Sequence, residues 1–399
     1  MKAVVCQNGQ LSVQLRPEPR PGVGQVLLKV LRCGICGSDL HVRQHCDAWG
    51  TLMARSGYKS LMRADQAVVF GHEFSGEVLE YGPGCARKSK PGTPVVASPA
   101  LRVGAEIDMI GLSARVDGAY AERVVVQESS MMPIPNGLSP DLAALTEPLA
   151  VGLHAVHRGD VKRGDVAVVI GCGPVGLAII CLLKARGVKT IIASDFSPGR
   201  RRLASTCGAH VVVDPAVHSP YANWREFGFI EDVPATLEMI VSTREKLGRL
   251  PIPWWHAWRL AEMFTGDPRG PVVFECVGAP GVLQSIIEGV PQFARIVVVG
   301  VCMQSDRIEN AVAINKALQI RFSAGYSPLE FRDTLHAMAY GRVDCEALIT
   351  GVVGLQGVEA AFTALGDPET HAKILIDPHI DTTTAYGDMP MDTTHSMAG

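Results

Sequence analysis

The sequence predicts an α/β protein in which a doubly wound parallel-sheet domain is joined to a second, β-rich domain. The chain has 399 residues, of which 47% are hydrophobic and 19% charged, so it is long enough for two domains with large cores. The first 150 or so residues contain short strand-like runs separated by turns. From about residue 165 onward strands alternate with helices, which is typical of a parallel sheet with crossover connections.

The first part of the chain carries the signals of short antiparallel strands. Residues 25–30 and 67–70 are apolar or alternate between apolar and polar positions. The sequences Gly82-Pro83-Gly84 and Pro91-Gly92 are turn signals. We therefore expect a compact, mostly β domain over residues 1–155.

The second part has a different pattern. Residues 166–170 are apolar at every position, as in a strand that is buried on both faces of a sheet. The further signals follow in this order: helix 174–186, strand 189–194, helix 200–207, strand 210–213, strand 272–276 and strand 296–299. This pattern predicts a dinucleotide-type domain over 156–312 with an insertion at about 221–268. We expect a return segment, 313–378, to complete the first domain, and 379–399 to form a loose tail.

Composition excludes several classes of function. The formal net charge of −3 lacks the basic excess of a nucleic-acid-binding protein. The most hydrophobic run, 166–183, contains Gly171, Gly173, Pro174 and Gly176, which suit a strand–turn–helix better than a membrane span. The 11 cysteines lack the spacing of a disulfide framework, and Met1 leads directly into a strand pattern without a targeting segment. We expect reduced thiols and a cytoplasmic protein that acts on small molecules.

A glycine-rich turn predicts a nucleotide site of the Rossmann type. Gly171, Gly173 and Gly176 match G-x-G-x-x-G between a strand and a helix, with Pro174 and Val175 at the helix start. The glycines allow a tight turn, close approach of a pyrophosphate and close packing of helix on strand, and the helix N-terminus attracts the phosphates. Asp195 ends the next strand, where a carboxylate binds ribose hydroxyls and repels a 2′-phosphate, so NAD is favoured over NADP. Arg200 lies close by and tempers this preference, because an arginine can accept a 2′-phosphate.

Three separated residues offer the donor set of a catalytic zinc. Cys36 supplies a thiolate, His72 an imidazole, and a downstream glutamate a carboxylate. A catalytic zinc takes three protein ligands and leaves one position open. Zinc polarises an alcohol without changing its own redox state, as hydride transfer requires. The conjunction of these residues, rather than any one of them, predicts the site.

Four motifs resemble the zinc-containing medium-chain dehydrogenases, particularly the sorbitol and threonine dehydrogenase branch. They are C-G-I-C-G-S-D-L-H at 33–41, G-H-E at 71–73, E-P-L-A at 147–150 and G-C-G-P-V-G at 171–176, in the family's order and approximate spacing. The resemblance implies a GroES-like catalytic domain, an active site between the domains, oxidation of an alcohol or polyol by NAD to an aldehyde or ketone, and a homodimer or homotetramer.

The resemblance also implies roles for individual residues. Cys36 and His72 hold the zinc, with Glu73 or Glu147 as the remaining ligand. Ser38 hydrogen-bonds the substrate oxygen and His41 passes its proton toward solvent, while Asp39 orients His72. Two later loops border the cofactor: Cys276, Val277 and Gly278, and Val299, Gly300 and Val301.

The sequence departs from the family at three places. Family members with a structural zinc carry four cysteines after the strand that corresponds to 95–98, but residues 99–118 contain none, so we expect one zinc and not two. Extra residues lie between His41 and His72. The insertion at 221–268 is rich in tryptophan and phenylalanine. Its aromatic side chains either pack on their own domain or form an oligomer contact or a lid.

Two alternative functions share the fold. One is a zinc-free, NADPH-dependent quinone or enoyl reductase of the same superfamily, which would lack the set of zinc ligands. The other is a non-catalytic cofactor-binding protein, because a fold does not determine a function.

Overall fold

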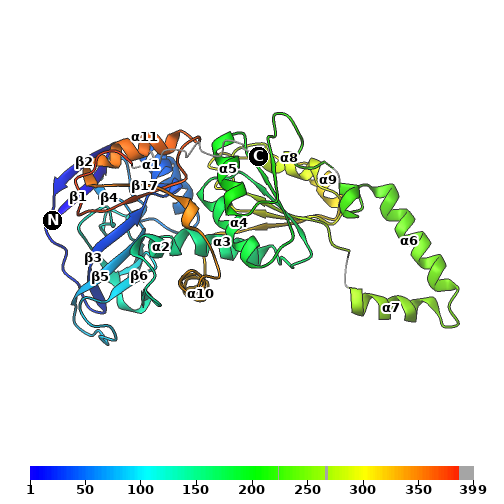
Figure 1. The fold of residues 1–399 in the computed structure, drawn as a ribbon, viewed down its shortest axis with the longest axis horizontal. Coiled ribbons are helices and arrows are strands. Elements are labelled where there is room, and N and C mark those ends of the chain that lie inside the picture. Colours follow the sequence, from blue (N-terminus) through cyan, green and yellow to red (C-terminus); the bar gives the residue numbers. More distant parts are fainter. Residues whose placement is uncertain (223, 266–267, 386–399) are drawn as a thin grey trace, which may run out of the picture. The chain divides into compact units, whose positions relative to one another are not determined.

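The computed structural model describes residues 1–222, 224–265 and 268–385, and divides the chain into two compact units. Unit 1 comprises residues 1–148 and the chain from 331 onward, and unit 2 comprises residues 149–330 (Figure 1). The sequence predicted divisions after 155 and 312. The second division lies later because strand β16 (Gln319–Phe322) pairs with strand β15 (Arg295–Val298) and keeps its segment in unit 2.

Unit 2 is built on a six-stranded parallel sheet in the order β13-β12-β11-β14-β15-β16. The other strands are β11 (Val166–Ile170), β12 (Thr190–Ser194), β13 (Val211–Val213) and β14 (Val272–Glu275). The chain runs outward from β11 to one edge and then from β14 to the other. This is the doubly wound topology that the sequence predicted, and ligands bind such sheets beside the carboxyl ends of the strands where the order reverses.

Helices connect these strands. Between consecutive strands lie α4 (Pro174–Ala185), α5 (Pro198–Cys207), α8 (Val282–Gly289) and α9 (Asn310–Asn315). Helix α3 (Thr146–Arg158) precedes β11, and α10 (Pro328–Ala339) follows β16. Helix α4 is apolar almost throughout, and its residues 176–183 are buried. Helices α4 and α5 begin with proline, which suits the first turn because it has no N–H to leave unpaired.

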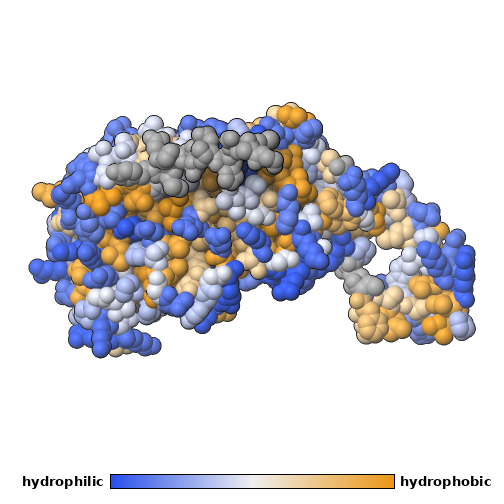
Figure 2. All heavy atoms as spheres, viewed as in Figure 1, coloured by the Kyte–Doolittle hydropathy of each residue, from blue (hydrophilic) through white to orange (hydrophobic). Residues whose placement is uncertain are grey.

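The predicted insertion is helical. Between β13 and β14 the chain forms the short helix η2 (Trp224–Phe227) and the helices α6 (Val233–Gly248) and α7 (Trp254–Thr265). Trp224 packs into the core of unit 2, where its indole Nε1 donates to the carbonyl of Gly289 at 2.9 Å. Figure 2 shows many apolar residues on the surface of α7. The insertion therefore has one part in the core and another on the surface.

Unit 1 is β-rich, as predicted. Its largest sheet has the order β10-β6-β5-β3-β18-β17, with β9 also paired to β3, and β2-β1-β4 form a second sheet. The strands are β1 (Lys2–Gln7), β2 (Gln10–Leu15), β3 (Gln25–Gly34), β4 (Val68–Val69), β5 (Glu73–Tyr81), β6 (Pro94–Ala97), β7 (Ala100–Val103), β8 (Glu106–Met109), β9 (Arg123–Gln127), β10 (Met131–Pro133), β17 (Ile349–Val353) and β18 (Lys373–Ile376).

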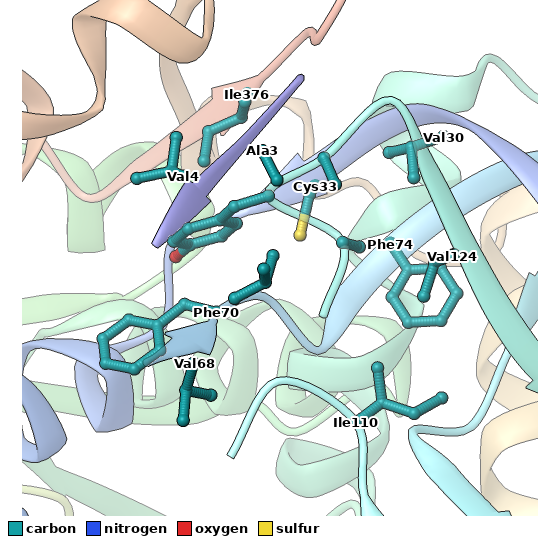
Figure 3. Packing of buried hydrophobic residues seen from close by; sticks show 14 of the residues in the cluster. Ala3, Val4, Val30, Cys33, Val68, Phe70, Phe74, Ile110, Val124 and Ile376 are labelled. Atoms are coloured by element: carbon teal, nitrogen blue, oxygen red, sulfur yellow. The ribbon is translucent and has the colours of Figure 1, made fainter. Parts of the chain in front are cut away.

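Strand β3 pairs with β5 on one side and, at its end, with β18 from the far end of the sequence. The core between the sheets is formed by alternate apolar residues, among them Phe70, Phe74 and Ile376 (Figure 3). The remaining elements are α1 (Gly37–Arg55), α2 (Pro140–Ala144), α11 (Val358–Gly366) and the short helices η1 (Glu128–Ser130), η3 (Glu346–Leu348) and η4 (Leu355–Gly357). The extra residues between His41 and His72 thus form a long helix with a kink at His45.

The first part of the expected tail is held by hydrogen bonds. The imidazole Nε2 of His379 lies 3.0 Å from the carbonyl of Val30, and the amide of Gly354 donates to the carbonyl of Thr382 at 2.7 Å. Residues 379–385 therefore belong to unit 1 rather than to a loose tail, and residues 386–399 lie outside the described part of the chain. In that described part, no helix combines the length and the apolar character that a bilayer span requires.

Candidate metal centre and nucleotide-binding loop

Two turns of unit 1 position the predicted zinc ligands. Cys36 lies at the N-terminal end of helix α1, directly after strand β3. His72 and Glu73 follow Gly71, whose φ of +102° favours glycine. A Cβ at Gly71 would also lie 2.5 Å from Cδ1 of Tyr120 and 2.8 Å from Sγ of Cys33. The chain can therefore turn into β5 at this point only with glycine, and this turn aims His72 toward Cys36.

Cys36, His72 and Glu73 come together. Each offers one ligand atom, and these sulfur, nitrogen and oxygen atoms all lie within 4.8 Å of one another. It is the one group of three or more such residues that the described part of the chain contains. Glu147, in the first turn of α3, is outside this group. A thiolate, an imidazole and a carboxylate at this spacing suit a tetrahedral zinc with one open position.

Asp39 contacts two of these three residues, His72 and Cys36. Its Oδ1 lies 3.3 Å from Nδ1 of His72, and its Oδ2 accepts from the Cys36 amide at 3.1 Å and from the Tyr120 hydroxyl at 2.6 Å. Asp39 is fully buried. Because Nδ1 faces this carboxylate, Nε2 is the nitrogen left for a metal. Nε2 lies 3.2 Å from the hydroxyl of Ser38.

Lys373 is a member of the centre that the sequence analysis missed. Its ammonium group donates to Oε2 and Oε1 of Glu73 at 2.6 and 2.9 Å and to the carbonyl of Ile35 at 2.9 Å. Both side chains of the ion pair are buried. A lysine within the apolar strand β18 was the available signal, since a buried charge needs a partner.

The charges of the centre influence one another strongly. Burial raises the pKa of the Cys36 thiol, and the nearby Glu73 raises it further, while His72 opposes both. Burial would lower the pKa of His72, but Asp39 and Cys36 raise it well above the usual range. The pKa of Lys373 is raised as well, because Glu73 and Cys36 outweigh the opposing effect of burial, with Glu147 contributing. A divalent cation among these atoms would favour the thiolate and the neutral imidazole.

In unit 2, the glycine motif forms a turn between β11 and α4. Gly171 has a φ of +90°, and a Cβ at Gly176 would lie 2.0 Å from the carbonyl oxygen of Gly171, so helix and strand can approach only with glycine there. At Gly173, the N-cap of α4, a Cβ would meet nothing within 4 Å. Pro174 and Val175 open the helix. The amides of this turn thus border open space, as an anion-binding helix start requires.

Asp195 lies beside this turn. Its Oδ2 accepts from the Cys172 amide at 2.8 Å and its Oδ1 from the Ser197 amide at 2.9 Å. Arg200 is close, with Nη1 4.0 Å from Oδ2, whereas Arg201 pairs with Asp214 at 3.0 Å. The backbone thus fixes the carboxylate at the end of β12, the position that the sequence analysis assigned to it.

Glu275 joins the two loops predicted to border the cofactor, and the sequence analysis missed it. Its Oε1 accepts from the amides of Val277 and Gly278 at 2.8 Å, and its carbonyl accepts from Val299 and Gly300 at 2.8 and 2.9 Å. Cys276 follows it, and Val301 lies against Gly278. The signal was an acid at the end of the buried strand β14, directly before a turn.

Comparisons with known proteins agree with this arrangement. Residues 22–136 match the family model of the alcohol dehydrogenase GroES-like domain, and residues 174–340 match that of the zinc-binding dehydrogenases. Over 95% of its length the chain is 31% identical to the whole of the (R,R)-butanediol dehydrogenase of Bacillus subtilis. It is 26% identical to the sorbitol dehydrogenase of Bacillus subtilis, over 95% of this chain and 98% of that relative.

Solved structures agree as well. The crystal structure of a butanediol dehydrogenase from Bacillus subtilis matches with a TM-score of 0.71 and 29% identity, over 94% of this chain and 99% of that one. A full-length relative above 30% identity, together with models that match both parts of the fold, shows the family. The chain belongs to the zinc-containing medium-chain dehydrogenases, the oxidoreductases that act on alcohols and polyols.

Proposed function

We propose that the chain transfers a hydride from the CH–OH group of a small diol or polyol to NAD and forms a ketone or an aldehyde. The observation that carries the proposal is the convergence of Cys36, His72 and Glu73 in front of the buried Asp39. The substrate class is supported by the butanediol and sorbitol dehydrogenases that the chain matches over nearly all of their length.

The donor set fits one catalytic zinc held by Cys36, His72 and Glu73. A bound zinc would polarise the alcohol oxygen, and a bound nicotinamide would accept the hydride. Glu73 is favoured over Glu147 as the third ligand because only its carboxylate lies in the cluster. Lys373 neutralises part of its charge, so the centre would carry less net negative charge than its two anionic ligands suggest.

The chain's own residues provide a route for the alcohol proton. The hydroxyl of Ser38 lies beside Nε2 of His72 and can accept a hydrogen bond from a substrate oxygen placed there. His41 follows three residues later on helix α1, so it lies on the same side of the helix as Ser38, and it is exposed to solvent. Ser38 would take up the proton and His41 would release it, while Asp39 positions His72.

The position of Asp195 supports NAD as the cofactor. Its carboxylate lies beside the glycine turn, where it can accept from ribose hydroxyls and would repel a 2′-phosphate. The loops 276–278 and 299–301, joined by Glu275, would border the nicotinamide end.

A single zinc per chain is supported by what occupies the cysteine-free segment 99–118. Strands β7 and β8 form a hairpin there. Arg115 forms an ion pair with Asp108, with Nε 3.0 Å from Oδ2, and donates to the carbonyl of Val103 at 3.1 Å and to Glu106. Asp108 is fully buried. This ion-pair network would fix the segment in place of a structural metal.

Two further expectations follow from the family and the thiols. We expect a homodimer or homotetramer, as in the related enzymes. The eleven cysteines lack the spacing of a disulfide framework, and a reducing compartment such as the cytoplasm would keep them as thiols.

The test is to purify the chain, measure its zinc content and follow NADH formation with butanediol stereoisomers, sorbitol and simple alcohols, with NAD⁺ and NADP⁺ in parallel. We expect one zinc per chain and turnover of at least one diol or polyol, with NAD⁺ preferred. Cys36→Ser should lose both zinc and turnover, whereas the control Cys46→Ser, on the same helix but outside the cluster, should keep them. Full activity after chelation would overturn the zinc assignment and favour a zinc-free reductase, while zinc binding without any turnover would favour a non-catalytic role.

A further inference from the structure

The inserted segment between β13 and β14 forms a pair of helices that meet near the turn between them (Figure 1). The guanidinium of Arg244, on α6, lies 4.3 Å above the ring of Trp254, at the start of α7. Trp254 in turn meets Trp255 and Trp258 with ring centroids 5.9 and 6.3 Å apart. We call residues 233–264 the helical hairpin.

The hairpin exposes many large apolar side chains. On α6 they follow a helical stripe with spacings of four, three and one residues, so they share one face of the helix. The apolar side chains that are at least two-fifths exposed are Val233, Leu237, Ile240, Val241, Leu250, Ile252, Trp255, Leu260, Met263 and Phe264. Phe264 is 82% exposed and Met263 is 74% exposed. In Figure 2, apolar surface is visible on the hairpin, most of it along α7.

The exposed area is large enough for a stable interface. At roughly 200 Å² for a large side chain, ten such residues that are about half exposed offer on the order of 1,000 Å² of apolar surface. The largest apolar patch of a typical monomer measures roughly 300–600 Å². A standard protein–protein interface buries about 800 Å² on each partner. The hairpin surface thus exceeds the usual patch and matches what a dimer needs.

The hairpin does not cover this surface itself. None of the α6 side chains is buried, and between residues 254 and 264 of α7 only Ala257 is. Two helices of this length with almost no core have little stability on their own, because helical stability comes mainly from burial of an apolar face. A partner that covers this surface must therefore be present whenever the chain folds, and a second copy of the same chain meets that requirement.

The charge of the hairpin region also favours a second copy. Residues 231–265 contain five acidic and four basic residues, a net charge of −1 from nine charges of mixed sign. Nucleic acid and anionic membranes attract surfaces with a basic excess, which is missing here. A surface of mixed sign and almost no net charge meets its own copy without strong repulsion.

We propose that the helical hairpin is a dimerisation element, whose apolar surface is covered by the hairpin of a second copy. Two hairpins related by a two-fold axis would form a four-helix bundle, in which the same surface serves both partners. This inference concerns assembly and does not depend on the proposed function.

The test compares the molar mass of the wild-type chain with that of Leu260→Glu/Phe264→Glu, by size-exclusion chromatography with light scattering over a dilution series. We expect the double variant to have half the wild-type mass, with a dissociation constant raised more than about 100-fold, since four glutamates would enter the apolar bundle. The control Leu15→Glu/Val23→Glu makes the same change at residues of unit 1 that are 84% and 75% exposed, and should keep the wild-type mass. An unchanged mass in the folded hairpin variant would overturn the proposal.

Cross-linking of the wild-type chain tests the same point if the variant does not fold. Lys246 is the one lysine between residues 190 and 315. In a mixture of unlabelled and isotope-labelled protein, we expect mixed-isotope links from Lys246 to the hairpin region of a second copy, including Lys246 to Lys246. Links from Lys246 found solely within one chain would show that the hairpin folds back on its own units, and would overturn the proposal. Binding to phosphatidylcholine vesicles by a chain that stays monomeric would also overturn the proposal, and would indicate that the apolar surface binds a membrane.

Discussion

At the scale of single residues, the position of Lys373 in the candidate metal centre is tightly fixed by its partners. Its buried ammonium group is held by both carboxylate oxygens of Glu73 and by the carbonyl of Ile35. Removing one partner of such a pair leaves an uncompensated charge in the interior, which costs much more than the pair itself contributes. Lys373 therefore links the stability of strand β18 to the charge state of Glu73, the proposed third zinc ligand.

We predict that Lys373→Met destabilises the metal-free chain by about 3–5 kcal/mol, because Glu73 then remains buried and unpaired. Zinc should recover much of this loss, since the metal supplies the missing positive charge. Denaturant unfolding with zinc and with a chelator measures both effects. Combining the change with Glu73→Gln should restore part of the stability, and Lys90→Met, at an exposed position, should have almost no effect. Equal losses with and without zinc would show that Lys373 does not balance this site.

The same residue shows why sequence reasoning found only part of the centre. Cys36 and His72 stand in short motifs, and the conjunction of their residue types with a glutamate predicted their chemistry. Lys373 follows Glu73 by 300 positions and carries no motif, and the two come together because β3 pairs with both β5 and β18. The choice between Glu73 and Glu147 was likewise a matter of tertiary position, because both are carboxylates beside suitable elements.

At the scale of elements, the glycine motif before α4 meets two separate requirements, each through a different glycine. A methyl group at Gly176 would overlap the carbonyl oxygen of Gly171, whereas one at Gly173 would point into open space. Packing of helix on strand therefore depends on Gly176. Approach of a ligand to the backbone depends on Gly173.

We predict that Gly176→Ala lowers the unfolding free energy by about 1–3 kcal/mol, because backbone atoms must move to admit the methyl group. Gly173→Ala should leave the melting temperature nearly unchanged and weaken NAD binding at least about 10-fold, because the methyl group would occupy the space of the pyrophosphate. Thermal unfolding and fluorescence titration with NADH separate the two outcomes. Unimpaired NADH affinity in Gly173→Ala would mean that the phosphates bind elsewhere.

A second element-scale feature fastens α3 to the start of α10. Glu330 accepts at its carboxylate from Nδ1 of His154 at 3.0 Å, from Nδ1 of His157 at 2.8 Å and from the Ser327 amide at 2.8 Å. Burial would raise the pKa of Glu330, but the Ser327 amide and His157 outweigh it and lower the pKa to about 2. All four residues belong to unit 2 and lie near its two ends.

This lowered pKa sets a direction for the pH dependence of stability. Glu330 stabilises the fold fully above its usual pKa of 4.5, and the contribution is lost as pH falls from there toward about 2. We predict that Glu330→Gln destabilises the chain at neutral pH and that its difference from wild type shrinks in acid. Urea unfolding at a series of pH values checks this, with the exposed Glu346→Gln as the control. A difference that stays constant down to acid pH would contradict the assignment.

At the scale of the whole molecule, the parts of the fold with a regular apolar pattern in the sequence were predicted well. The helices of the inserted segment and the boundaries of the units were not. Five of the six strands of the parallel sheet of unit 2 were predicted, because apolar runs such as 166–170 and 272–275 are buried on both faces, whereas β16 was assigned to the return segment. The interruption at 221–268 was predicted, but the two helices within it were not. Their apolar side chains do not face a core of the same chain, as those of an ordinary amphipathic helix do. The boundaries of the units were displaced because β16 joins the sheet of unit 2 through pairing, which sequence composition does not reveal.

The two sites lie in different compact units, the metal cluster in unit 1 and the glycine turn in unit 2. Each ligand should therefore stabilise its own unit first, because a ligand that binds only the folded state adds stability where it binds. In hydrogen–deuterium exchange, we predict that zinc protects the amides around residues 33–39 and 71–75 together with strand β18. NAD should protect 171–177, 195–200 and the loops that Glu275 joins. Gly173→Ala should abolish the NAD effect and leave that of zinc intact, whereas Cys36→Ser should do the reverse. Protection by NAD in the metal-binding segments alone would show that the cofactor binds outside the glycine turn, and would remove the basis for assigning Asp195 to the ribose.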